Sequence, residues 1–157
     1  MSKFQLKNFF KAAYDLMLVF LQFFIISLHF FQWEFIPQKK IIQASPFSYF
    51  LGILIIIIAF IIMLVSIKDL GRNLSPFPRP LNNSNLVTTG IYGFTRHPMY
   101  YSLIFISIGV CIIKLSIYYL FLTISLSLII KFKIALEEKY LMNKFKNYLL
   151  YKNEVKV

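Results

Sequence analysis

The chain has 157 residues, of which 59% are hydrophobic and 18% aromatic, and its formal net charge is +11. The apolar share exceeds the ~45–50% of ordinary globular domains and lies in long uncharged blocks, so we expect one all-α integral membrane domain over residues 1–157 and no separate soluble domain. The Lys and Arg residues lie between and beyond these blocks, where they suit anionic lipid headgroups as partners and not nucleic acid.

Two apolar blocks in the first half predict two membrane helices. The first, at 12–31, follows three lysines, but no small-residue cleavage site comes after it, so we interpret it as a membrane helix and not as a signal peptide. The second, at 46–67, is uncharged, and at ~1.5 Å per residue it is long enough to cross a ~30 Å hydrocarbon core. We expect Asp15 at headgroup depth and His29 at the membrane surface, and His29 is assigned no role.

The second half predicts a long loop, a helical hairpin and a surface helix. Residues 68–98 hold four of the six prolines and three of the five glycines, so we expect a cytosolic loop without regular helix, and its aromatic second half favours a function. The next apolar stretch predicts a hairpin over 99–135 that turns near 114–116. Residues 136–157 alternate apolar and charged side chains at helical spacing and predict an amphipathic helix on the membrane surface.

The expected fold therefore has about four transmembrane helices, in a plasma or other inner membrane. Of the 17 Lys and Arg residues, three lie before the first block, four lie in the loop and seven lie after residue 130. With four crossings these three segments share one side of the membrane, and only Lys39, Lys40 and Lys114 lie on the other side. The positive-inside rule then predicts that both termini and the loop are cytoplasmic. The hairpin brings Glu137 and Glu138 to the same side as the loop.

The stretch LVTTGIYGFTRHPMYY, residues 86–101, is the candidate site. Pro98 suits the first turn of a helix, so the N–H groups of Met99, Tyr100 and Tyr101 are expected as free donors that attract an anion. Several kinds of side chain surround this point. Gly90 and Gly93 allow close backbone approach, and Tyr92 offers an aromatic ring with a polar end. The cations are Arg96 and His97, and the hydrogen-bond acceptors are Glu137 and Glu138. Such a pocket suits a ligand with a carboxylate, an ammonium, a ribose and a flat base. The alternative interpretation is an interfacial connector with an aromatic belt.

GIYGFTRHPMY, followed by EEKYLMNKFKNYLLY after the hairpin, resembles the isoprenylcysteine carboxyl methyltransferase and phospholipid methyltransferase superfamily over roughly residues 68–152. The resemblance implies S-adenosylmethionine as cofactor, held in a cytosolic pocket, and a lipid-like substrate that enters sideways between helices. The residues that it implies for the cofactor are Leu86, Val87, Tyr92, His97, Pro98, Met99, Tyr100 and Glu137. Gly90 and Glu138, which the pocket suggested from the residues alone, complete the expected cofactor-binding set.

The resemblance also implies catalytic residues, for which we take Arg96, Lys133 and Glu137. Lys133 stands four residues before Glu137, where the isoprenylcysteine enzymes carry an arginine for the substrate carboxylate. We favour O-methylation of a prenyl- or isoprenylcysteine-type carboxylate over N-methylation of a phospholipid amine. A nicotinamide-dependent membrane reductase, using NADPH, and a non-catalytic membrane protein of the same fold stay open. No metal site is expected, because Cys111 is the single cysteine and the two histidines are predicted on opposite sides of the membrane.

Overall fold

A computed structural model of the chain describes residues 3–30, 39, 41 and 43–156. The regular elements among these residues are all helical, which confirms the all-α part of the predicted fold class. They are α1 (Lys3–Phe30), α2 (Pro46–Leu70), α3 (Pro98–Lys114), α4 (Ile117–Lys144), α5 (Tyr148–Glu154) and two short 3-10 helices, η1 (Gly71–Asn73) and η2 (Gly90–Gly93). The predicted end of the first span at residue 31 and the predicted placement of Lys40 fall outside the described residues.

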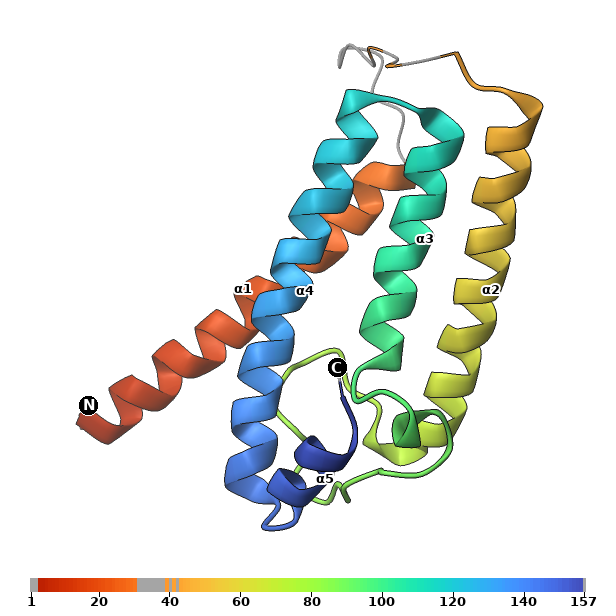
Figure 1. Cartoon of the computed structure of the whole chain (residues 1–157). Helices are drawn as coiled ribbons and strands as arrows, with labels where there is room; N and C mark the ends of the chain where they lie inside the picture. The colour runs from red at the N-terminus through yellow and green to blue at the C-terminus, as the bar shows by residue number, and fades with distance from the viewer. Residues whose placement is uncertain (1–2, 31–38, 40, 42, 157) are drawn as a thin grey trace.

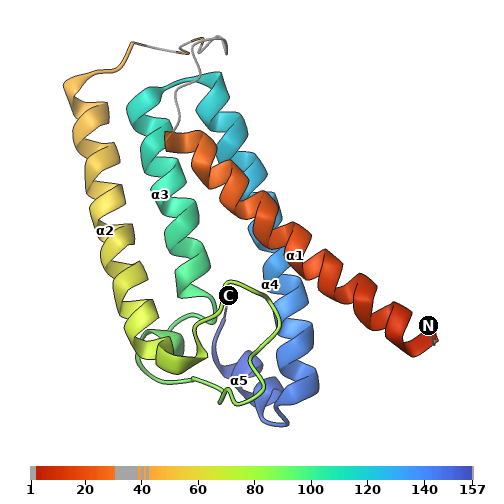
Figure 2. The same cartoon turned by 180° about the vertical axis from the view of Figure 1, so that it is seen from behind.

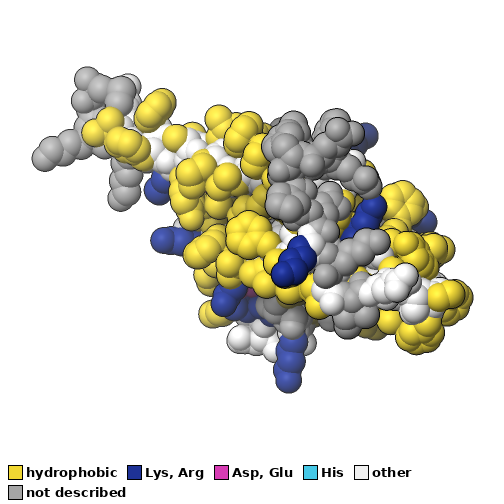
Figure 3. All heavy atoms as spheres, turned by 90° about the horizontal axis from the view of Figure 1, so that it is seen from above, with side chains coloured by type: hydrophobic (Ala, Val, Ile, Leu, Met, Phe, Trp, Pro, Cys, Tyr) yellow, Lys and Arg dark blue, Asp and Glu magenta, His cyan; other side chains and the backbone are white. Residues whose placement is uncertain are grey.

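The long helices form an elongated bundle. α2, α3 and α4 run side by side, and α1 packs on α4 while its N-terminal half leaves the bundle (Figures 1 and 2). α1, α2 and α4 are each long and apolar enough to cross a membrane, whereas α3, with 17 residues, is a shorter apolar helix. Figure 3, seen from the end opposite α5, shows hydrophobic side chains around the visible sides of the bundle. The count of four crossings stays a prediction.

The hairpin turn between α3 and α4 lies where the sequence predicted it. Leu115 adopts a left-handed conformation, with φ 44° and ψ 45°, and its N–H donates to the carbonyl oxygen of Cys111. Ser116 then begins α4, because its side chain accepts a hydrogen bond from the N–H of Tyr118. The short turn makes α3 and α4 antiparallel neighbours, and so it brings the start of α3 beside the end of α4.

α2 and α3 pack backbone to backbone where two glycines meet. A Cβ on Gly52 would lie 2.7 Å from the carbonyl oxygen of Gly109, and a Cβ on Gly109 would lie 2.8 Å from the carbonyl oxygen of Gly52. Small residues of this kind let membrane helices approach closely. Because α2 leads into the loop and α3 follows it, this contact fixes the two ends of the loop relative to each other.

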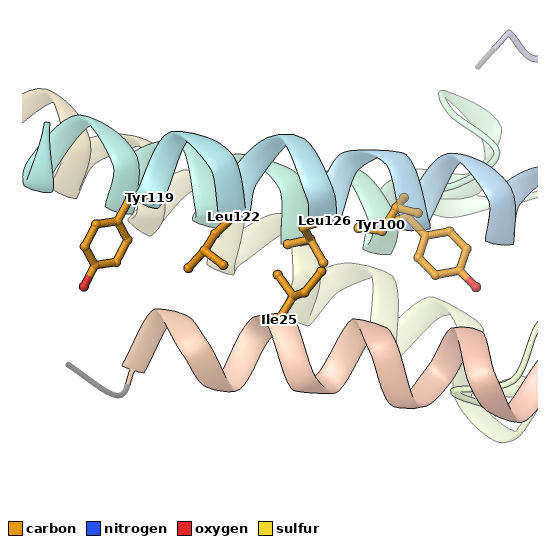
Figure 4. Close-up of a cluster of buried hydrophobic side chains, with 6 residues drawn as sticks. Ile25, Tyr100, Tyr119, Leu122 and Leu126 are labelled. Carbon is orange, nitrogen blue, oxygen red and sulfur yellow. The ribbon is translucent and has the colours of Figure 1, made fainter. Parts of the chain in front are cut away.

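The core of the bundle lies between α1 and α4. Tyr119, Leu122 and Leu126 point from α4 towards Ile25 of α1, and Tyr100 closes the same cluster from α3 (Figure 4). The cluster is fully apolar except for the tyrosine hydroxyls. It therefore holds α1 against the hairpin. Tyr100, the member of the cluster on α3, lies at the end of the bundle where the loop lies.

The prediction of one amphipathic surface helix over 136–157 is wrong. α4 continues to Lys144, because residues 136–144 are good helix formers without Gly or Pro. Phe145 then takes an extended conformation, with φ −115° and ψ 114°, and the short helix α5 follows. Tyr148 and Tyr151 of α5 are buried, so α5 packs its aromatic face onto the end of the bundle.

Candidate functional site

The loop, the start of α3, the end of α4 and α5 meet at one end of the bundle (Figure 1). Residues from these segments line a pocket there. The predicted site residues that line it are Leu86, Val87, Tyr92, Arg96, His97, Met99, Tyr100 and Glu137, whereas Gly90, Pro98, Lys133 and Glu138 are not part of its lining. Its volume of about 80 Å³ is well below the ~300–1,000 Å³ of pockets for drug-sized ligands.

The start of α3 is bonded more tightly than the sequence predicted. α3 begins at Pro98, as expected, but the N–H groups of Tyr100 and Tyr101 both donate to the carbonyl oxygen of His97, at 3.1 and 3.2 Å. Short-range bonds of this kind satisfy the otherwise free donors of a first helical turn. The prediction of free donors is therefore wrong for Tyr100 and Tyr101, and of the three predicted donors only the N–H of Met99 can still serve an anion.

Glu137 faces the pocket together with Tyr100 and His97. The Tyr100 hydroxyl donates to Glu137 Oε2 at 2.7 Å, and the His97 ring stacks on the Tyr100 ring with 5.8 Å between centres. Tyr100 and His97 are only 5% and 4% exposed. A carboxylate can accept about four hydrogen bonds, so Glu137 keeps capacity for a ligand hydroxyl or ammonium group. Tyr100 of α3 and His97, which caps α3, thus orient the carboxylate of Glu137 on α4.

Glu138 serves a different set of partners. Arg96 donates to Glu138 Oε1 from Nε at 2.9 Å and from Nη2 at 2.8 Å, and His97 Nε2 lies 3.3 Å from the same oxygen. Lys152 of α5 donates to Oε2 at 2.7 Å. Arg96 Nη1 also donates to the carbonyl oxygens of Lys152, at 3.2 Å, and Val155. Glu138 and Arg96 therefore tie the loop, α4 and α5 together.

Lys133 lies in the protein interior just behind the pocket, and it is 1% exposed. Its Nζ donates to Gln22 Oε1 of α1 and to the carbonyl oxygen of Pro76 at 2.9 Å, and it lies 5.2 Å from the centre of the Tyr100 ring. The ion pairs found among the described residues do not include Lys133. Neutral acceptors thus hold the buried amino group of Lys133, and Glu137, one turn further along α4, interacts with it electrostatically.

Gly90 supports the site from outside the pocket. Its φ of +63° is left-handed, and a Cβ there would lie 2.1 Å from Asp69 Oδ2. The same oxygen accepts a hydrogen bond from the N–H of Ile91 at 2.9 Å. Asp69 at the end of α2 therefore holds η2 in place, and η2 carries Tyr92 into the pocket wall. This contact requires glycine because both the backbone conformation and the space exclude a side chain.

α1 contributes polar side chains that the sequence analysis did not assign to the site. Asp15, expected at headgroup depth, is buried and forms an ion pair with Arg79 of the loop at 3.0 Å. The Tyr140 hydroxyl of α4 donates to Asp15 at 3.1 Å. Gln22 holds Lys133, as described above. Asp15 and Gln22 are seven residues apart and so share one face of α1. This spacing, which is visible in the sequence, could have indicated the face of α1 that contacts the site.

The two tyrosines of α5 complete the pocket wall, and the motif resemblance left their roles open. The Tyr151 hydroxyl donates to the carbonyl oxygen of Tyr92 at 2.7 Å. Burial raises the pKa of Tyr151 to about 12, and burial, followed by the charge of Glu137, raises the pKa of Tyr92 above its usual range. Both phenols are therefore protonated at physiological pH and act as hydrogen-bond donors and not as bases.

Comparisons with known proteins match this site region. The family model of the phospholipid methyltransferases matches residues 47–148, which include the loop, α3 and α4. The protein-S-isoprenylcysteine O-methyltransferase of Saccharomyces cerevisiae is 33% identical over 130 residues, which cover 77% of this chain and 54% of that protein. The chain thus spans about half the length of this relative. Because the family match covers well over half of the chain and most of the pocket, the chain belongs to the phospholipid methyltransferase family.

Proposed function

We propose that the protein is an S-adenosylmethionine-dependent membrane methyltransferase with a lipid-like acceptor. The observation that carries the proposal is the convergence of the loop, α3, α4 and α5 on one pocket, which gathers the motif residues from both halves of the sequence pattern. Leu86 and Val87 supply an apolar wall for a flat base, and Glu137 supplies a carboxylate for an ammonium or ribose hydroxyl group. Tyr92, His97 and Met99 complete the proposed cofactor contacts.

We favour a prenyl- or isoprenylcysteine-type carboxylate as the acceptor. When bound, the cofactor supplies a sulfonium methyl group, to which a carboxylate oxygen bonds while the electrons of the broken C–S bond stay on sulfur. No base is needed, so the protein has to align the acceptor and exclude water. Lys133 is the proposed partner of the acceptor carboxylate, since it is a buried cation beside Tyr100. Arg96 is engaged by Glu138 and α5, which favours a positioning role for it.

The hydrocarbon part of the acceptor is proposed to lie between the helices. A groove of about 620 Å³ runs between α1, α2 and α3, with a mostly apolar lining that includes Ile26, Phe60 and Leu103. Leu103 is one helical turn from Tyr100, so an acceptor in this groove has its polar head near the pocket. In this arrangement four helices cross the membrane, and the loop and both termini face the cytoplasm.

A phospholipid amine is the second candidate acceptor, because the matching family is described by phospholipid methylation. The buried charge of Lys133 argues for the anionic acceptor, since an ammonium headgroup would meet a like charge at short range. Transfer of labelled methyl groups to a prenylcysteine and to phosphatidylethanolamine, tested side by side, separates the two.

The first test is S-adenosylmethionine binding to the full chain purified in detergent. We expect saturable binding by the wild type and its loss in His97→Ala and Glu137→Ala. Glu154→Ala is the matched control, because Glu154 is exposed on α5 and outside the pocket lining. A well-folded wild type that does not bind S-adenosylmethionine contradicts the proposal, and binding of NADPH instead would favour the reductase alternative.

A further inference from the structure

We propose that the hydroxyl of Tyr148 is a direct contact for the bound cofactor, presented to it by α5. This inference rests on the proposed function and assigns a role to Tyr148, a residue to which the motif resemblance gave none. It begins with α5, a helix of seven residues whose two buried tyrosines, Tyr148 and Tyr151, line the pocket. Figure 2 shows α5 packed beside the end of α4 and across from the loop.

The Tyr148 hydroxyl is buried in the pocket wall without a hydrogen-bond partner among the described residues. The side chain as a whole is 0% exposed. A buried hydroxyl that finds no partner destabilises the fold, and the great majority of such groups in proteins are paired. A polar group of a ligand in the pocket would supply the missing hydrogen bond and remove this cost. The removal of the cost would then contribute to the free energy of ligand binding.

The environment of the hydroxyl suits a donor. Burial, followed by the charge of Glu138, raises the pKa of Tyr148 above its usual range, so the phenol is protonated at physiological pH. The cofactor offers acceptors of the required kind, namely a carboxylate and ribose oxygens. The Tyr148 ring also packs edge-on against the Tyr151 ring, with 5.9 Å between centres, which restricts its orientation.

Fixed contacts keep Tyr148 at the pocket. Lys152, one helical turn further along α5, is bonded through Nζ to Glu138, and its carbonyl oxygen accepts from Arg96. Tyr151 is bonded to Tyr92 of the loop. α5 is therefore bonded to both the loop and α4, while the hydroxyl of Tyr148, a residue that lines the pocket, has no partner among the described residues.

Two tyrosine-to-phenylalanine variants on the same helix test the inference. Tyr148→Phe removes an unpartnered hydroxyl, whereas Tyr151→Phe removes one that donates to a backbone carbonyl. We expect Tyr148→Phe to weaken S-adenosylmethionine binding about three- to tenfold, the range for one neutral hydrogen bond, and to leave the Tm of the unliganded protein unchanged or higher. Tyr151→Phe is expected to lower that Tm.

The outcomes separate this inference from the proposed function. If the wild type binds S-adenosylmethionine and Tyr148→Phe binds it equally well, the inference is wrong and the proposed function stands. If Tyr148→Phe lowers the unliganded Tm as much as Tyr151→Phe does, the hydroxyl has a structural partner and the inference is again wrong. If the wild type itself does not bind S-adenosylmethionine, the proposed function fails, and this inference fails with it.

Discussion

At the scale of single residues, Lys133 and Gln22 give the sharpest test of how the acceptor is recognised. Lys133 is held by Gln22 and a carbonyl oxygen, so its charge has no ion-pair partner among the described residues. Gln22→Glu keeps the size of the side chain and places a carboxylate against Nζ. We expect the KM for the acceptor to rise about tenfold or more, because the new ion pair competes with the acceptor for a charge-assisted hydrogen bond. S-adenosylmethionine affinity should stay within about twofold.

The matched control for this prediction is Gln5→Glu, which adds the same charge at an exposed position of the same helix. It should leave both constants unchanged. Steady-state kinetics with varied acceptor, together with cofactor binding, provide the measurement. An acceptor KM that Gln22→Glu does not raise would show that Lys133 does not bind the acceptor through its charge.

The residues of the site differ in how far the sequence could predict them. The cluster of Tyr100, His97 and Glu137 could be inferred, because two motifs on either side of a hairpin have to meet. The bond between Glu138 and Lys152 could not, because Lys152 reaches Glu138 only after the chain reverses at residues 145–147. That reversal follows from the burial of the α5 tyrosines, and periodicity alone does not distinguish a face that meets protein from one that meets lipid.

At the scale of elements, α1 carries a polar stripe that its high hydrophobicity conceals. Asp15, Gln22 and His29 follow one another at intervals of seven residues, and each contacts the bundle. His29, expected at the surface without a role, lies with Nε2 at 2.7 Å from the hydroxyl of Ser107 on α3. Polar residues within membrane helices usually face protein and not lipid. The spacing therefore predicts which face of α1 is buried, although it does not predict the partners.

We expect the contacts that hold α5 in place to control the affinity for the cofactor. The Lys152 side chain is 34% exposed in its pair with Glu138, so this bond is the accessible part of the cluster. Lys152→Met should weaken S-adenosylmethionine binding about two- to fivefold, since partly exposed ion pairs contribute about 0.2–1 kcal/mol. Hydrogen exchange in residues 148–154 should become faster.

Lys156→Met is the matched control for Lys152→Met, because it removes the same charge just beyond the end of α5. It should change neither the exchange of α5 nor the affinity. If Lys152→Met leaves the exchange of α5 unchanged, then Arg96 and Tyr151 alone hold this helix, and the ion pair of Lys152 has no part in closing the pocket.

At the scale of the whole molecule, the arrangement in the membrane depends on α3. Its 17 residues span about 26 Å at ~1.5 Å per residue, slightly less than a ~30 Å hydrocarbon core. α3 can still cross, because Lys114 at its end can extend its ammonium group towards the headgroups. Figure 1 shows the α3–α4 turn at one end of the bundle and α5 at the other, so these two points should lie on opposite sides of the membrane.

Single cysteines test this arrangement directly. In a Cys111→Ser background, Lys114→Cys and Glu154→Cys each introduce one thiol, at opposite ends of the bundle. A membrane-impermeant maleimide added to intact cells should label Lys114→Cys, and it should label Glu154→Cys only after the membrane is opened. Since most Lys and Arg residues lie at the α5 end, the positive-inside rule requires this pattern. The reverse pattern would place the pocket outside the cytoplasm, away from the supply of S-adenosylmethionine that the proposed function needs.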